Sequence, residues 1–208
     1  MVAAITPKNC LVRGCGFLII WCTLNLVVWQ WGEYLARSFL PLYKMSFSEF
    51  SNHYELLSMR LVNQLEPTFN IQVITTGQRE LGELAVPNGI VIDAQTLQGH
   101  AFQSVIIMLS MLFIWPLQRA WHRGVLLIVA LPIMVVILML DVPLVLLGSL
   151  EDLVLANFYP EILTHSVSIM AMNSLNGGGR LLLGVLGAGI STLITLLLLQ
   201  MGKSFQKH

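Results

Sequence analysis

Four apolar stretches, each close to the length that a helix needs to cross a bilayer, constrain this chain most. They are residues 15–31, 101–117, 124–147 and 181–201. A spanning helix needs about 20 mostly apolar residues, and the second stretch approaches that length if its helix starts near Gln98. Only 11% of the residues are charged, against about 25% in an average soluble domain. We therefore expect a mainly α protein built on a four-helix transmembrane bundle that contacts membrane lipids.

Lysine and arginine are segregated on one side of these predicted spans. With the N-terminus in the cytoplasm, the inner segments contain no Asp or Glu and hold Lys8, Arg13, Arg119, Arg123, Lys203 and Lys207. The outer loop that begins at Gly148 carries Glu151, Asp152 and Glu161 and no basic residue before Arg180. Because positive charge is retained on the cytoplasmic side, both termini are predicted to be cytoplasmic, in the inner membrane of a bacterium.

The spans divide the chain into three predicted parts. Residues 1–31 form the cytoplasmic N-terminus and the first transmembrane helix, and residues 32–100 form an extracytoplasmic segment. Residues 101–208 contain the second, third and fourth transmembrane helices, with a second extracytoplasmic loop at 148–180. Within that loop, Leu150–Phe158 is predicted to be a short interfacial helix, and residues 163–175 a second interfacial or a re-entrant helix.

The segment 32–100 is predicted to be a small α+β insert, a helix followed by a β-hairpin. Ser46 and Glu49 have the spacing of a capping box, and Pro67 would end the helix. Strands are expected at Phe69–Thr75 and Ile90–Ala94. Because so short a segment buries a thin core, we expect its apolar helix stripe to face a partner or the membrane helices. The stripe consists of Phe47, Phe50, Leu57 and Leu61.

Asp141 is the ionisable residue that most suggests a function, since it lies near the outer end of the third apolar stretch. Carboxylates within a membrane are costly and are often functional. One interpretation is therefore a role in transport or in pairing with a partner. The alternative is a helix end that is solvated or locally hydrogen-bonded.

The entry to the fourth span, Asn176-Gly177-Gly178-Gly179-Arg180, is a second candidate site. Backbone amides at a helix N-terminus beside a guanidinium could hold an anion or a lipid headgroup. The alternative is a flexible turn with an arginine that anchors it at the interface. Further along this span, the small residues Gly184, Gly187 and Gly189 predict close packing within the bundle in preference to a dimer interface.

Several function classes receive no support from the residues. The net charge is zero, so no basic surface indicates a nucleic-acid partner. Glu49 and His53 are one helical turn apart, but no further Cys or His is spaced to complete a metal site with them. The sequence predicts no catalytic residues, no metal and no cofactor.

The layout of the chain resembles a known group of proteins. A Trp-rich first span is followed by the segment Phe69-Asn-Ile-Gln-Val-Ile-Thr-Thr76, then by two spans joined through a basic turn, and finally by a span entered through Asn176–Arg180. This resembles the small integral membrane proteins that accompany bacterial exosortases, the enzymes of C-terminal sorting systems. Exosortases use a catalytic Cys near the outer face, whereas all three cysteines of this chain lie at or in the first apolar stretch. The resemblance therefore implies an associated protein and not the peptidase, and it assigns no residue a role.

Three hypotheses follow for the function. The first is a non-catalytic accessory subunit or assembly factor of a bacterial inner-membrane complex, whose partners are integral membrane proteins. The alternative is a small transporter or channel-like component that uses Asp141 and the segment Asn176–Arg180. A membrane enzyme is the weakest hypothesis, because it would require Asp141, His165 and Arg180 to converge.

Overall fold

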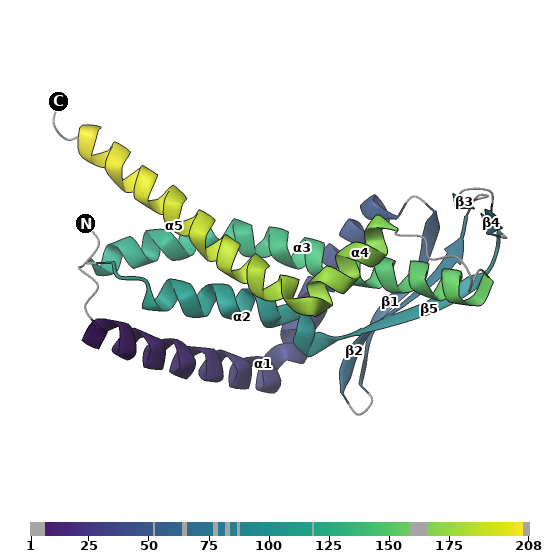
Figure 1. Ribbon diagram of the computed structural model, residues 1–208, viewed down its shortest axis with the longest axis horizontal. Helices are drawn as coiled ribbons and strands as arrows, with labels where there is room; N and C mark the ends of the chain where they lie inside the picture. The colour runs from purple at the N-terminus through teal and green to yellow at the C-terminus, as the bar shows by residue number, and fades with distance from the viewer. Residues whose placement is uncertain are drawn as a thin grey trace. The chain divides into compact units, whose positions relative to one another are not determined.

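The computed structural model describes residues 7–51, 53–63, 66–76, 79–81, 84–86, 88–117, 119–158 and 166–205. The described chain is mainly α, with an antiparallel sheet between its first and second helices (Figure 1). The helices are α1 (Pro7–Phe50), α2 (Gln98–Ile114), α3 (Ala120–Phe158), α4 (Val167–Ser174) and α5 (Arg180–Phe205), and a π-helical turn, η1 (Leu175–Gly179), connects α4 to α5. The strands are β1 (Tyr54–Asn63), β2 (Pro67–Thr75), β3 (Arg79–Leu81), β4 (Leu84–Val86) and β5 (Val91–Leu97).

Three helical segments are long and apolar enough to cross a membrane: Leu11–Phe50, Ala120–Phe158 and Val167–Met201. They indicate a multi-pass membrane protein. The remaining apolar helix, α2, begins at Gln98 as predicted but has only 17 residues. At 1.5 Å per residue it is about 26 Å long, slightly less than the hydrocarbon core of about 30 Å. A membrane crossing by α2 therefore stays a prediction.

The chain forms two compact units. Unit 1 contains residues 1–30, 102–137 and 180–208, and unit 2 contains residues 31–101 and 138–179. The extracytoplasmic segment predicted at 32–100 is thus packed together with the second half of α3 and with α4. This agrees with the expectation that so short a segment needs other helices to complete its core.

Unit 1 is a helical bundle with a small apolar core. Its buried cluster comprises Met108, Leu112, Leu126, Ala130, Ile137 and Ala188. The small residues of α5 allow close approach, because a Cβ atom on Gly184 would lie 2.6 Å from the backbone oxygen of Ser104. A Cβ atom on Gly187 would lie 2.8 Å from Cδ1 of Ile137. The predicted role in packing is thus confirmed for Gly184 and Gly187, whereas nothing lies within 4 Å of a Cβ atom added at Gly189.

Unit 2 is built on the three-stranded antiparallel sheet, in the order β1-β2-β5. Side chains alternate along β2, so that Phe69, Ile71 and Val73 are buried on one face. The second half of α1 contributes Tyr43, whose ring meets Phe69 edge to face at a centroid distance of 5.2 Å. The strands predicted at Phe69–Thr75 and Ile90–Ala94 correspond to β2 and β5. A shorter pair, β3 and β4, forms a separate two-stranded ladder.

The helix predicted to start at Ser46 and end before Pro67 is wrong. Residues around Ser46 are the last turns of α1, which ends at Phe50, and residues 54–63 form β1, not a helix. Pairing of β1 with β2 satisfies its backbone groups and buries Tyr54 and Met59. This long-range pairing outweighs the local helical spacing of apolar residues. The insert is therefore a sheet packed on helices, not a helix with a hairpin.

The partner-facing stripe predicted on that helix does not exist as one surface. Phe47 is fully buried and Phe50 is exposed, both at the end of α1. Leu57 and Leu61 lie on β1, where Leu57 is 49% exposed and Leu61 is half-buried. Of the four residues, Leu57 is the one that projects from the sheet into the surroundings.

The loop predicted at 148–180 is also more helical than expected. The third span was expected to end at Leu147 and to be followed by a separate helix, but α3 continues without a break to Phe158. Gly148 permits this continuation to pack against α4, because a Cβ atom there would lie 2.5 Å from the backbone oxygen of Ser168. The helix expected within 163–175 corresponds to α4, although residues 159–165 lie outside the described part of the chain.

Replacing Gly184 by alanine should destabilise unit 1. The added Cβ atom would overlap the backbone of α2 at Ser104, and overpacking of this kind costs about 1–3 kcal/mol. The matched control is Gly189→Ala, on the same helix, where nothing lies within 4 Å of the added atom. We expect the thermal unfolding midpoint in detergent to fall for Gly184→Ala only, and equal midpoints would contradict the packing of α5 on α2.

Candidate functional site

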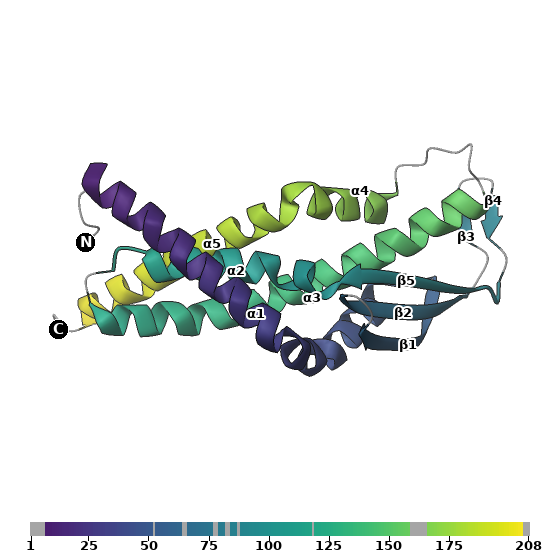
Figure 2. The same ribbon diagram turned by 90° about the horizontal axis from the view of Figure 1, so that it is seen from below.

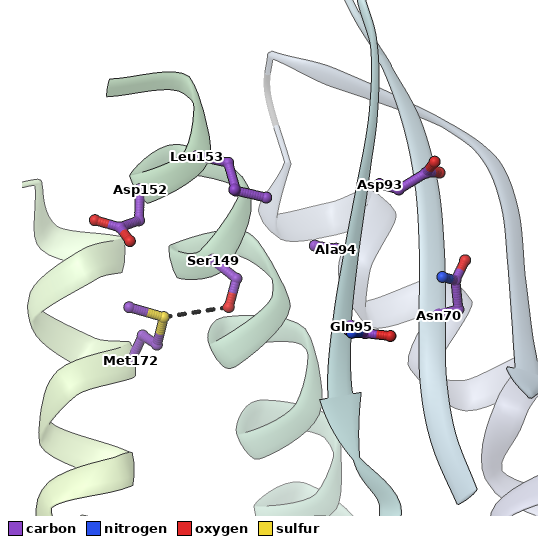
Figure 3. Close-up of a pocket in the computed structure, with 8 residues that line it drawn as sticks. All are labelled: Asn70, Asp93, Ala94, Gln95, Ser149, Asp152, Leu153 and Met172. Atoms are coloured by element: carbon purple, nitrogen blue, oxygen red, sulfur yellow. Dashed lines mark hydrogen bonds between the residues drawn. The ribbon is translucent and has the colours of Figure 1, made fainter. Parts of the chain in front are cut away.

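Unit 2 contains a cavity of about 540 Å³. Figure 3 shows that its walls come from α3 and α4 on one side and from β5 and β2 on the other. The residues that line it are Asn70, Asp93, Ala94, Gln95, Ser149, Asp152, Leu153 and Met172. Five of the eight lining residues are polar and two of them carry carboxylates, so the cavity is a candidate site for binding or catalysis.

The polar side chains of this cavity do not converge on one point. Along β5, Ala94 projects towards α3, whereas Asp93 and Gln95 project to the other side of the strand (Figure 3), as alternation in a strand requires. Asp152 extends from α3 towards α4 in the same view. With their carboxylates pointing apart, Asp93 and Asp152 do not form a paired acid and base.

The helical wall of the cavity is held by side-chain hydrogen bonds. Ser149 Oγ donates to the carbonyl oxygen of Val145 at 2.9 Å and lies 3.2 Å from Sδ of Met172 on α4. Ser166 caps the N-terminus of α4 by accepting from the backbone N–H of Ser168 at 3.2 Å. The hydroxyl of Ser166 also donates to the carboxylate of Glu151. These bonds tie the start of α4 to α3, so this wall serves mainly to position two helices.

Asp141 lies on α3 with its side chain completely buried, at 0% exposure. It is close enough to Tyr43 of α1 for its charge to act on the phenol electrostatically. Tyr43 is itself fully buried, and its hydroxyl has no hydrogen-bond partner among the described residues. Asp141 is therefore not a solvated helix end. It is part of the packed core of unit 2, where a carboxylate is costly.

The five residues from Asn176 to Arg180 pass through the turn between α4 and α5. Gly178 has φ of +112°, a conformation that favours glycine because it carries no Cβ atom. Gly179 packs so closely that a Cβ atom would lie 2.6 Å from the carbonyl oxygen of Ser174. The side chain of Arg180 is only 3% exposed. A contact of these residues with an anion or a lipid headgroup stays a prediction.

Sequence reasoning missed Tyr43, Ser149 and the pair of Glu151 with Ser166. The sequence did contain a signal for Tyr43, because Ala36, Tyr43 and Phe47 follow a helical spacing. All three are fully buried on α1. The pairing of Glu151 with Ser166 had no such signal, because it joins residues fifteen positions apart on two different helices. Of the residues that an enzyme would require to converge, His165 lies outside the described part of the chain.

Neither a metal centre nor a known relative assigns a role to this arrangement. Among the residues that the structure describes, no three His, Cys, Asp or Glu side chains are grouped so that they could hold a metal ion. No protein-family model, curated protein or solved structure matches the chain. The function is therefore inferred from the residues themselves, and the resemblance to exosortase-associated proteins stays a prediction.

Replacing Tyr43 by phenylalanine should leave unit 2 as stable as before or make it slightly more stable. A buried hydroxyl without a partner costs about 1–3 kcal/mol of desolvation, and Phe removes the hydroxyl while retaining the ring that meets Phe69. Ser166→Ala is the contrasting variant, because the loss of an N-cap lowers stability by about 1 kcal/mol. Thermal unfolding in detergent measures both, and a marked loss of stability in Tyr43→Phe would mean that the hydroxyl is bonded.

Proposed function

We propose that this chain is a non-catalytic accessory subunit of a bacterial inner-membrane protein complex, one that belongs to an exosortase-type sorting system. In this proposal both termini lie in the cytoplasm and the sheet of unit 2 lies on the outer side of the membrane. The sheet provides the surface that another protein subunit binds. The observation that carries the proposal is the open edge of β1 with Leu57 exposed on it.

The strand β1 is one edge of the sheet and is the outermost strand in Figure 2. In the described part of the chain it pairs with β2 alone, through nine of its ten residues. The other edge strand, β5, lines the cavity together with residues of α3 and α4. An open edge presents unpaired backbone N–H and C=O groups, which can accept an added strand from another chain.

A β-bulge interrupts this edge at Leu57. The register of β1 against β2 shifts between Leu56 and Ser58, so Leu57 has no partner residue in β2. Its side chain is 49% exposed. Bulges twist an edge and prevent unselective pairing with any passing strand. A bulge that also exposes a leucine favours a partner with a complementary apolar surface over an arbitrary strand. This selectivity supports a dedicated subunit interface.

Replacing Leu57 by aspartate should weaken the association with the partner subunit. A charge placed in a desolvated apolar contact costs about 1–2 kcal/mol or more, which is about a tenfold loss of affinity or more. The chain is purified in mild detergent with its native membrane proteins, and the co-purified proteins are quantified by mass spectrometry.

The matched control for this experiment is Val91→Asp. Val91 is 50% exposed and lies on β5, at the opposite edge of the same sheet. Both variants introduce one charge at equal exposure, so their thermal stabilities should be similar. We expect the partner to be lost from Leu57→Asp and retained by Val91→Asp. If both variants retain every associated protein, the subunit proposal is wrong.

One observation favours a second candidate, a small transporter or channel-like component. Asp141 is a fully buried carboxylate within the apolar stretch 124–147 of α3, and buried carboxylates in membrane proteins often carry protons or cations. The segment Asn176–Arg180 would then provide a flexible turn beside the path of the transported ion.

If the chain transports a proton or a sodium ion, Asp141→Asn should abolish the flux. Asparagine keeps the shape of the side chain and removes the charge, so expression and membrane insertion should be retained. Flux is measured in proteoliposomes that contain a pH-sensitive or a sodium-sensitive dye. Tyr43→Phe serves as a control that leaves the carboxylate in place. Absence of flux in the wild-type protein, or equal flux in Asp141→Asn, would remove this second candidate.

A further inference from the structure

The edge of the sheet that β5 forms borders the cavity of unit 2. In the sheet order β5 is an edge strand, and among the described residues it pairs with β2 alone. Asp93, Ala94 and Gln95 of β5 line the cavity, and the wall across from them comes from α3 and α4 (Figure 3). The cavity volume of about 540 Å³ lies within the range of about 300–1,000 Å³ that is typical of binding pockets.

The hydrogen-bond register shows which backbone groups of β5 face away from β2. The N–H of Thr75 donates to the carbonyl oxygen of Ile90 at 3.0 Å, and this pair continues the register of β2 against β5. Hydrogen-bonded pairs alternate with non-hydrogen-bonded pairs along an antiparallel ladder. Ile92 and Ala94 on β5 therefore direct their backbone groups to β2, as Ile90 does.

Asp93 and Gln95 occupy the alternate positions of β5, so the backbone N–H and C=O groups of both residues point away from β2. Both residues line the cavity, and they present two donors and two acceptors at its border. Such outward-facing residues of a strand are about 7 Å apart, which is also the repeat of donors and acceptors along a second extended chain. Main-chain hydrogen bonds of this kind provide the affinity when a peptide adds to a sheet edge.

The side chains of the cavity favour an extended ligand over a compact one. Asp93 and Gln95 project to one side of β5 and Ala94 projects to the other (Figure 3), so no cluster of side chains surrounds a single point. Among the described residues no three His, Cys, Asp or Glu side chains are grouped to hold a metal ion. A chain that runs along β5 contacts both sides of the strand in turn.

The charge of the lining indicates the chemistry of that chain. Asp93 and Asp152 are both exposed carboxylates, and none of the described residues that line the cavity is Lys, Arg or His. Arg60 lies in the same row of the sheet as Gln95, but on β1, with β2 between them. Clefts lined by one sign of charge raise the local concentration of the opposite charge, and opposite charges on neighbouring strands attract. The complementary ligand is therefore basic.

We propose that this cavity binds an extended segment of another protein that contains Lys or Arg, and that the segment adds to β5 as an antiparallel strand. Antiparallel addition continues the pattern of the sheet, in which β1, β2 and β5 are antiparallel. A basic side chain directly opposite Asp93 lies on the same face of the sheet as that carboxylate. The next residue of the segment lies on the face of Ala94, where a small apolar side chain fits. This site goes beyond the proposed subunit function, because it lies at the opposite edge from β1.

The experiment measures peptide binding to the full chain in mild detergent by fluorescence anisotropy. The probe is a fluorescein-labelled peptide that alternates lysine with valine, and its charge control alternates glutamate with valine. Two further versions of the basic peptide carry backbone N-methyl groups, either on every lysine or on every valine. In antiparallel addition with the lysines opposite Asp93 and Gln95, the lysine N–H groups face β5 and the valine N–H groups face outwards. We expect saturable binding of the basic peptide and of its valine-methylated version only.

A second measurement places the peptide at β5. Asp93→Asn keeps the shape of the side chain and removes its charge, so the affinity for the basic peptide should fall by about 2- to 5-fold, as the loss of one cross-strand charge pair implies. The matched control is Glu55→Gln. Glu55 is an exposed carboxylate of the same sheet, but it lies on β1, at the edge away from the cavity. This variant should bind the peptide as the wild-type protein does.

Three results would overturn the proposal: no saturable binding of the basic peptide, binding of the lysine-methylated version as tight as that of the parent, or equal affinities of Asp93→Asn and the wild-type protein. The second of these would mean that charge alone attracts the peptide. Leu57 lies on β1 and takes no part in this site. A failure of peptide binding therefore leaves the proposed subunit function untouched, and the reverse also holds.

Discussion

The need to bond every backbone polar group inside a bilayer governs this structure. In hydrocarbon that need is met by helices, and here two of the helices are much longer than a membrane is thick. The helices α1 and α3 have 44 and 39 residues, whereas about 20 residues are enough to cross the hydrocarbon core. Each contributes one half to unit 1 and the other half to unit 2. A single helix thus meets the requirements of the membrane and then provides a wall for a folded unit.

This arrangement explains how a small sheet can be stable without disulfides. Three strands alone bury a thin core, but the second halves of α1 and α3 add fully buried side chains to unit 2, namely Tyr43, Phe47, Leu146 and Leu150. The same packing places Asp141 and Glu151 of α3 in the interior. Glu151 is used to fix the cap of α4 through Ser166. The pair of Ser166 and Glu151 thus positions the start of α4 against α3.

Outside the cavity, one edge of the sheet remains open in the described chain. The edge of β1 offers backbone groups and Leu57. An edge of this kind suits recognition of another protein by strand addition, which is the basis of the proposed function.

The sequence by itself determined the features that depend on neighbouring residues. Apolar length and composition predicted the apolar cores of α1, α3 and α5, the start of α2 at Gln98, the strands β2 and β5, and the packing role of Gly184 and Gly187. The tertiary structure decided what depends on distant residues. Tyr54, Leu56, Met59 and Leu61 alternate as a strand only once the bulge at Leu57 is known, and without it Tyr54, Leu57 and Leu61 match a helix. Contacts between segments far apart in the chain likewise decide three further features: the burial of Asp141 beside Tyr43, the continuation of α3 to Phe158 and the pairing of Glu151 with Ser166. Local spacing of residues cannot encode such contacts.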